Sequence, residues 1–285
     1  DHFEKKEAKK MDRNTQLGVV AAREAVSHSR IIEDQVDKNR VGVIWGSGIG
    51  GLETFETEVL GWAKSEGIPR FNPFFIPKMI ADITPGHISM EYGFHGPNYT
   101  TVSACASSTN ALIDAKMLLQ LGKADVIVCG GSEAAVTASG MGGFNSMMAL
   151  STRNDDYKTA SRPFDKDRDG FVLGEGAGCI ILEEYEHAKK RGATIYAELA
   201  GGGLSADAYH MTAPHPEGLG AYLVMKNCLE DAGVTPDEVD HINMHGTSTP
   251  LGDIAESNAI VKLLGEHAFD IQLNSTKSMT GHLLG

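Results

Sequence analysis

Cys105 is the residue of this sequence best suited to covalent chemistry. It lies in the segment 101–110, directly before residues 111–121, whose apolar positions recur at helical spacing as far as Gly122. Where an extended segment turns into a helix, backbone N–H groups and the positive end of the helix dipole favour the reactive thiolate over the thiol. An inert, packed cysteine fits the same position equally well, because cysteine is among the most buried residue types.

Two histidines form the second group of candidates. His245 ends a strand-like run, and His282 follows Lys277 in a loop behind another strand-like run, 271–273. Loops at the carboxyl edge of an α/β sheet gather where ligands bind, so Cys105, the two histidines and the lysine could meet in one cleft. For a single histidine, a hydrogen-bonded residue at a strand end would be the better interpretation.

A glycine-rich run at 46–51 fits the dinucleotide-binding pattern G-x-G-x-x-G between a strand and a helix. The acidic residue that such a site needs, about 20 positions on, would be Glu66, which lies in a turn. We therefore interpret the glycines as a place where another backbone segment or a ligand comes close.

Metal sites are not predicted. His241 and His245 have the spacing of a zinc-binding helix, but Ile242 follows the first histidine and the segment is typical of a strand. Residues 165–170 begin like a calcium loop, yet the position that should hold a bidentate glutamate is Gly176.

Composition narrows the class of protein. The chain has 285 residues and a net charge of −13, which argues against nucleic acid or an acidic membrane as partner. It has neither an apolar run of membrane-spanning length nor a signal-peptide core, so a cytoplasmic protein is expected. The four cysteines, too far apart for a C-x-x-C pair, make a disulfide framework unexpected. One basic cluster is either a solvated helix face or a docking patch for an acidic partner: Lys5, Lys6, Lys9, Lys10 and Arg13.

The periodicity of apolar residues predicts an α/β protein. Helices are expected at 16–28, 53–62, 111–121, 185–191, 219–232 and 254–264, and strands at 40–45, 98–102, 124–129, 178–183, 239–246 and 271–273. A helix followed by a strand ending in glycine occurs twice, which suggests two related halves. The proline-bearing segment 71–77 is a pocket wall, a subunit interface or core filling, and 137–152 is expected to be a flexible, pocket-lining region around Phe144.

Six motifs, in order, resemble the β-ketoacyl-acyl-carrier-protein synthases, most closely their type II: VSACASS, STRNDDYKTASRPFDKDRDGFVLGEGAG, LEEYEHAKKRGA, SADAYHMTAP, HGTSTPLGD and STKSMTGHLLG. The similarity runs from about Lys5 to Gly285. It implies the thiolase-like fold, five layers α-β-α-β-α built from two similar halves, which we place at 1–194 and 195–285. It also implies that the first core strand and a C-terminal part of the second half lie outside these residues, without which we expect an inactive, poorly folded chain.

The resemblance implies a role for each chemical residue. Cys105 would accept the acyl chain from its carrier protein as a thioester, and His245 and His282 would stabilise the enolate formed when a malonyl thioester loses carbon dioxide. Attack of that enolate on the Cys105 thioester would give a 3-oxoacyl product two carbons longer. Lys277 would support the histidines electrostatically, with Asp253 and Glu256 as acidic partners. No metal or organic cofactor is required.

The resemblance also implies a set of binding residues. Acyl-pocket positions would be Ile49, Phe75 and Phe144, and contacts to the pantetheine arm would be Thr247 and Thr249. The basic surface that receives the acidic acyl carrier protein, whether acyl- or malonyl-loaded, would include Lys5, Lys6, Lys9 and Lys10. Met148 stands where relatives often have a carrier-binding arginine, so docking is expected to be weaker or arranged differently. A homodimer is expected.

Four alternatives stay open. A thiolase would need a second catalytic cysteine, for which none of Cys129, Cys179 and Cys228 is placed. A polyketide ketosynthase or a non-catalytic chain-length partner shares the fold, although the partner lacks the nucleophile that Cys105 provides. A dinucleotide-dependent oxidoreductase would rest on residues 46–51 alone. The preferred acyl chain length and the distinction between synthase types I and II are left undecided by the sequence.

Overall fold

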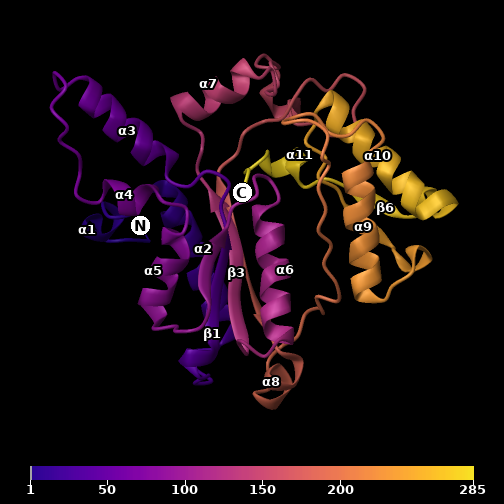
Figure 1. The fold of residues 1–285 in the computed structure, drawn as a ribbon, viewed down its shortest axis with the longest axis horizontal. Helices are drawn as coiled ribbons and strands as arrows, with labels where there is room; N and C mark the ends of the chain where they lie inside the picture. The colour runs from indigo at the N-terminus through magenta and orange to yellow at the C-terminus, as the bar shows by residue number, and fades with distance from the viewer. Residues whose placement is uncertain (1) are drawn as a thin grey trace. The chain divides into compact units, whose positions relative to one another are not determined.

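The computed structural model describes residues 2–285, which form two compact units (Figure 1). Unit 1 contains the chain up to Met141 together with Gly174–Glu198 and Leu283–Gly285, and unit 2 contains Gly142–Leu173 and Leu199–His282. Each unit is described by itself below.

The strands are β1 (Val41–Gly46), β2 (Asn98–Thr101), β3 (Val126–Glu133) and β4 (Gly176–Glu183) in unit 1, and β5 (His241–Asn243) and β6 (Gln272–Asn274) in unit 2. The helices of unit 1 are α1 (Lys5–Ala8), α2 (Arg13–Ser29), α3 (Leu52–Ala63), α4 (Phe75–Met79), α5 (Ile83–Tyr92), α6 (Ser107–Gln120) and α8 (Tyr185–Lys190). Helix α7 (Ala138–Ser146) crosses the boundary, and unit 2 holds α9 (Leu219–Ala232), α10 (Pro250–Leu264) and α11 (Lys277–Thr280).

The sheet of unit 1 has the order β2-β1-β3-β4. Strand β1 runs parallel to both of its neighbours, and β4 is antiparallel to β3. Gly46 pairs with Thr101 on one side and with Gly131 on the other, so the carboxyl ends of the three parallel strands lie side by side. The strand that leads to Cys105 therefore ends next to the glycine-rich run that follows β1.

Successive side chains of a strand point to opposite faces of the sheet, so the core of unit 1 has two parts, one on each face. Val43 and Trp45 pack on one face with Val19 of α2 and Ile88 of α5, whereas Ile44 packs on the other with the small residues of α6. The result is a layer of helices on each side of a mixed sheet, with α2 and α5 on one face and α6 on the other (Figure 1). Both faces are covered, which explains why β1 and β3 are continuous buried runs.

Unit 2 is built on the short parallel pair β5–β6, with Asn243 opposite Asn274. Its core joins Met244 to Ile260 and Leu264 of α10. Because the two strands are parallel and in register, the loops after them start from the same edge, as predicted for the loops that carry His245 and Lys277.

The α/β class and each predicted helix and strand are confirmed, with one wrong expectation for a region and one correction of extent. The region 137–152, expected to be flexible, holds helix α7, because the Glu56 carboxylate accepts the backbone N–H and the hydroxyl of Ser139 and fixes the helix start. The strand expected at 239–246 is only His241–Asn243, since the backbone N–H groups of His245 and Gly246 donate to Glu256 instead of a neighbouring strand.

Core filling by residues 71–77 was one of three interpretations, and it is wrong. Phe71, Phe74 and Ile76 are 39%, 43% and 54% exposed, and Phe75 at the start of α4 stacks on Phe55 and Phe71 as part of this surface cluster. Lys277, expected in a loop, begins the short helix α11. In residues 2–285, no helix combines the length and the apolar character needed to cross a membrane.

Candidate active site

Cys105 lies in a tight turn between β2 and α6 of unit 1. Ala104 before it has φ +52°, an uncommon conformation for a residue with a side chain. The Ser107 hydroxyl holds the turn, since it accepts from the Ser103 backbone N–H at 3.0 Å and donates to the Ala104 carbonyl at 2.7 Å. Cys105 is exposed at the start of a helix rather than packed in the core.

The glycine-rich run beside this turn is a close backbone approach, as predicted. A Cβ on Gly46 would lie 2.4 Å from the backbone nitrogen of Ser108 in the first turn of α6, so only glycine fits here. The N–H groups of Gly48, Ile49 and Gly50 donate to the carboxylate of Glu133. Donors that bind a dinucleotide phosphate in other folds are used here by an acidic side chain of the same chain, which argues against the oxidoreductase alternative.

Two predicted acyl-pocket residues lie on adjoining segments of unit 1. Ile49 is 42% exposed on the turn after β1, and Phe75 is half-buried at the start of α4. The segments touch, because the Gly51 N–H donates to the Met79 carbonyl at 3.0 Å.

The buried Cys129 is unsuited to nucleophilic chemistry. Burial raises the pKa of its thiol to about 12, so the thiol stays protonated. Burial also raises the pKa of Cys179.

In unit 2 the two predicted histidines come together. The ring centroids of His245 and His282 are 5.5 Å apart and the rings are perpendicular. His282 is only 4% exposed, and its backbone N–H donates to the Val172 carbonyl at 2.7 Å. Residues from the loop after β5 and from the segment after α11 thus share one site within this unit.

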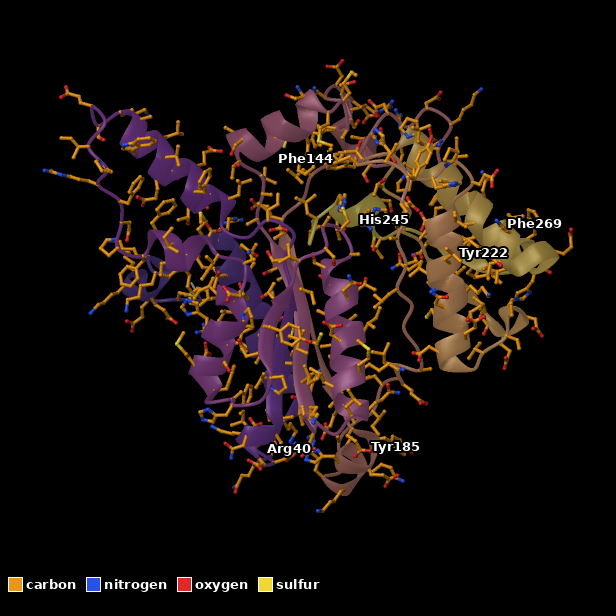
Figure 2. The ribbon with its side chains drawn as sticks, in the orientation of Figure 1. Arg40, Phe144, Tyr185, Tyr222, His245 and Phe269 are labelled. Atoms are coloured by element: carbon orange, nitrogen blue, oxygen red, sulfur yellow. The ribbon has the colours of Figure 1, made fainter. Side chains whose placement is uncertain are left out.

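A row of aromatic rings continues from this pair. Phe171 meets His282 edge-on at 5.2 Å, and Phe144 of α7 meets Phe171 edge-on at 5.3 Å. Figure 2 labels Phe144 and His245. Phe144 is therefore one ring removed from His282. The sequence predicted no role for Phe171. Its position directly after Gly170, whose N–H donates to the Ser248 carbonyl, is the feature of the local sequence that could have pointed to it.

Both imidazoles are neutral around neutral pH. Burial, helped by His245 and by the positive charge of Lys277, lowers the pKa of His282 to about 3. Burial and Lys277 lower the pKa of His245 to about 4. His245 keeps a solvent-exposed part, whereas His282 is enclosed. A neutral imidazole carries one N–H donor, which suits it to stabilise an oxygen that gains negative charge.

The carboxylate of Glu256 shapes the turn that carries His245. It accepts the backbone N–H groups of His245 at 2.6 Å and Gly246 at 2.8 Å. Burial raises the pKa of Glu256, and these hydrogen bonds oppose that shift. The hydroxyl of Ser275 donates to the Gly246 carbonyl at 2.8 Å, which ties this turn to the loop before Lys277.

Two more predicted residues adjoin this turn. The hydroxyls of Thr247 and Thr249 are 3.0 Å apart. Buried Asp253 accepts from the Phe164 N–H at 2.7 Å and pairs with Arg168 at 3.1 Å, so its contacts hold the start of α10.

The predicted docking lysines lie on or beside α1, and each is exposed: Lys5, Lys6, Lys9 and Lys10. The Lys10 ammonium lies 5.8 Å from the centre of the Phe74 ring. Met148, also exposed, belongs to unit 2.

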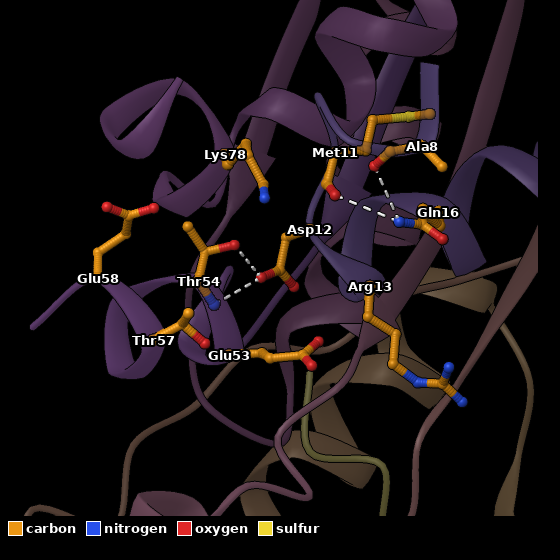
Figure 3. Close-up of a pocket in the computed structure, with 10 residues that line it drawn as sticks. All are labelled: Ala8, Met11, Asp12, Arg13, Gln16, Glu53, Thr54, Thr57, Glu58 and Lys78. Carbon is orange, nitrogen blue, oxygen red and sulfur yellow. Dashed lines mark hydrogen bonds between the residues drawn. The ribbon is translucent and has the colours of Figure 1, made fainter. Parts of the chain in front are cut away.

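Figure 3 shows a pocket of unit 1 between the start of α2 and α3. Asp12 accepts both the N–H and the hydroxyl of Thr54 there, and the Gln16 amide donates to the carbonyls of Ala8 and Met11. In the part of the chain that the structure describes, no predicted catalytic or substrate-binding residue lines this pocket.

Two family models cover almost the whole chain. The model for the N-terminal domain of β-ketoacyl synthases matches residues 1–188, and the model for their C-terminal domain matches residues 196–285. The 3-oxoacyl-[acyl-carrier-protein] synthase 2 of Staphylococcus aureus is 50% identical over 285 residues, which are 100% of this chain and 70% of that protein. The Synechocystis enzyme of the same name is 49% identical over 283 residues, 99% of this chain and 68% of that protein.

Solved structures agree. A ketosynthase in complex with its type II polyketide acyl-carrier protein has a TM-score of 0.91 at 36% identity, covering 95% of this chain and 68% of that one. A β-ketoacyl synthase from Burkholderia phymatum has a TM-score of 0.90 at 35% identity, covering 99% and 68%. These neighbours confirm the thiolase-like ketosynthase fold class. By sequence and by structure, the chain belongs to the β-ketoacyl synthase family.

Proposed function

We propose that this protein catalyses the decarboxylative condensation of an acyl thioester on Cys105 with malonyl-acyl-carrier-protein in fatty acid chain elongation. The observation that carries the proposal is the pair of neutral imidazoles, His245 and His282, in a chain 50% identical to a 3-oxoacyl-acyl-carrier-protein synthase.

The first step is acyl transfer. The Cys105 thiolate attacks the carbonyl carbon of the acyl carrier thioester, a new carbon–sulfur bond forms, and the carrier thiolate leaves and takes up a proton. The exposed position of Cys105 at a helix start supports this role. Covalent capture holds the electrophile in place for the second step.

The second step is condensation. The bond between the malonyl α-carbon and its carboxylate breaks, carbon dioxide leaves, and the electron pair moves onto the thioester oxygen as an enolate. N–H donors of His245 and His282 stabilise that oxygen, an effect worth several kcal/mol when the donors are already in place. The enolate carbon then attacks the Cys105 thioester and expels the cysteine thiolate, giving 3-oxoacyl-acyl-carrier-protein.

Lys277 acts on this step through its charge. The positive charge of Lys277 repels a second positive charge on either imidazole, and it therefore lowers the pKa of both histidines. It thereby keeps both histidines neutral, each with one N–H to donate to the enolate oxygen.

Substrate and carrier contacts are part of the proposal. Ile49, Phe75 and Phe144 would line the acyl chain, and the hydroxyls of Thr247 and Thr249 would contact the pantetheine arm. The exposed lysines of and after α1 would receive the acidic carrier protein. A ketosynthase solved with its acyl-carrier protein supports such a partner, and Met148 predicts a weaker contact at its position.

We also propose a homodimer, a cytoplasmic location and the division into halves at 194 and 195. The division into halves is supported by the two family models, of which the first ends at residue 188 and the second begins at residue 196.

The dimer is supported by β2, which is the end strand of its sheet, and by the exposed aromatic cluster around Phe71 and Phe74. Sedimentation at micromolar concentration tests the dimer, and a sedimenting monomer would contradict it.

Intact-mass analysis tests the central claim. After mixing with an acyl carrier thioester, the wild-type protein should gain the mass of one acyl group and Cys105→Ala should not. Acylation that persists in the variant would rule out Cys105 as the nucleophile.

A polyketide ketosynthase is the second candidate, favoured by the structural match to such an enzyme at 36% identity. Mass analysis of the product separates the two. One elongation by two carbons supports fatty acid synthesis, and a chain grown by repeated condensation supports the polyketide reaction.

A further inference from the structure

Glu133, at the carboxyl end of β3, is a fully buried carboxylate surrounded by backbone donors of unit 1. Oε2 accepts the N–H groups of Gly48 at 2.7 Å, Ile49 at 3.1 Å and Gly285 at 3.2 Å, and Oε1 accepts that of Gly50 at 3.1 Å. The Ser47 hydroxyl donates to Oε1 at 3.4 Å.

These bonds explain how an acidic group is accommodated in the core. A buried polar group costs several kcal/mol unless it is hydrogen-bonded, and a buried charge costs more. Both Glu133 oxygens accept from N–H donors, an arrangement that favours the ionised carboxylate. Burial raises the pKa of Glu133, and the bonds from the turn after β1 oppose this.

The carboxylate joins three segments that are distant in sequence. They are the turn after β1, the end of β3 and Gly285, whose carbonyl accepts from the Ser108 hydroxyl at 2.7 Å. Ser108 belongs to the first turn of α6, three residues after Cys105. Packing is tight, since a Cβ on Gly285 would lie 2.2 Å from the Gly48 nitrogen.

We propose that Glu133 is a positioning residue that sets acyl-chain selectivity. By holding three consecutive N–H groups, it fixes the backbone from which the Ile49 side chain extends, and so the space offered to the acyl chain. The inference rests on the proposed function, because it assigns Ile49 to the acyl pocket. The new element is that Glu133, a residue of β3, holds the backbone of Ile49 in place.

A matched control lies at the other end of the same strand pair. Glu133 pairs with Gly176 in the β3–β4 register, whereas Glu183 pairs with Val126 at the opposite end. The Glu183 carboxylate is also largely buried and binds Arg191 at 2.7 Å. Glu183→Gln therefore removes a buried charge from the same sheet without touching the turn that carries Ile49.

The experiment compares Glu133→Gln, Glu133→Asp and Glu183→Gln with wild type in the full-length enzyme. We measure kcat/KM for hexanoyl and tetradecanoyl carrier thioesters, together with hydrogen exchange of residues 48–50. Glutamine has the right shape but points an NH2 group at N–H donors. We expect Glu133→Gln to change the ratio of the two kcat/KM values about tenfold, mainly through KM, because small misplacements at a site cost rates of this order or more.

Exchange at 48–50 should quicken in Glu133→Gln at least about tenfold as well. Glu133→Asp, which keeps the charge on a shorter arm, should change the ratio less, and it decides the question if the glutamine variant does not fold. Glu183→Gln should lower the melting temperature and leave the ratio as in wild type.

An unchanged ratio in folded Glu133 variants, or the same change in Glu183→Gln, would overturn the inference. So would unchanged exchange at 48–50. Failure of the proposed function is seen separately, as a wild-type protein that neither acylates Cys105 nor releases carbon dioxide.

Discussion

The turn after β1 in unit 1 and the turn after β5 in unit 2 are built alike. Each follows a strand that comes after a long helix, α2 in one case and α9 in the other. In each turn, backbone N–H groups donate to a glutamate from elsewhere in the same unit, Glu133 in the first and Glu256 in the second. In both turns, a carboxylate therefore fixes the path of the backbone directly after the strand.

The two turns differ in what they present. The first has a fully buried carboxylate, held by three consecutive N–H groups, and carries the apolar Ile49. The second has a partly exposed carboxylate, held by two N–H groups, and carries the imidazole of His245. The same arrangement of N–H groups around a carboxylate thus positions the apolar side chain of Ile49 in one unit and the imidazole of His245 in the other. We expect changes in the turn after β1 to affect the acyl substrate and changes in the turn after β5 to affect decarboxylation.

The largest expected effect is that of Cys105→Ala. Loss of the nucleophile should lower acyl transfer at least about 10⁴-fold, as for nucleophiles in other covalent enzymes. Release of carbon dioxide from malonyl carrier should continue, because it needs only the groups of unit 2. Loss of both activities in the folded variant would mean that the two regions do not divide the reaction in this way.

Substitution of either histidine should give the opposite pattern. His245→Ala and His282→Ala each remove one N–H donor, which should lower carbon dioxide release about 10²- to 10³-fold. Acylation of Cys105, followed by intact mass, should remain. If both variants release carbon dioxide at the wild-type rate, the enolate role of the pair is wrong.

Glu256→Gln sharpens the comparison with Glu133. The amide keeps only one of the two oxygens that accept the His245 and Gly246 N–H groups, which should misplace the imidazole and lower carbon dioxide release about tenfold to 10²-fold. The preference between short and long acyl chains should stay unchanged, unlike in Glu133→Gln. Glu230→Gln, which changes a surface pair with Lys226 on α9, serves as the matched control. A shift in acyl preference in Glu256→Gln would contradict the separation.

The smallest expected effect is that of pH on the rate. The pKa values of both histidines lie below the ordinary 6.5, at about 3 for His282 and about 4 for His245. Carbon dioxide release should therefore vary less than about twofold between roughly pH 6 and 8. A rate that follows a group titrating within that range would contradict the neutral pair.

Stability has a different pH dependence. In the unfolded chain the histidines take up protons near pH 6.5, which they cannot do when folded. Their contribution to the free energy of unfolding is present above 6.5 and is lost as pH falls towards the folded values. Urea titrations across this range measure it, and His282→Gln should reduce the loss.

The sequence by itself determined the parts of this protein that depend on local pattern. Apolar spacing predicted the strands and helices, and the change from an extended segment to helical spacing after Cys105 predicted a turn into α6. The order of strands and loops predicted that the segments carrying His245 and Lys277 would leave the same sheet edge, because parallel strands in register end together.

Only the tertiary structure decided which distant groups complete each turn. Glu133 binds N–H groups of the turn after β1 at separations of 83 to 85 residues and that of Gly285 at a separation of 152 residues. The row from Phe144 through Phe171 to His282 joins three separate segments. Such partners cannot be read from spacing, because a strand-end N–H can donate to any carboxylate that the packing of other elements brings to it.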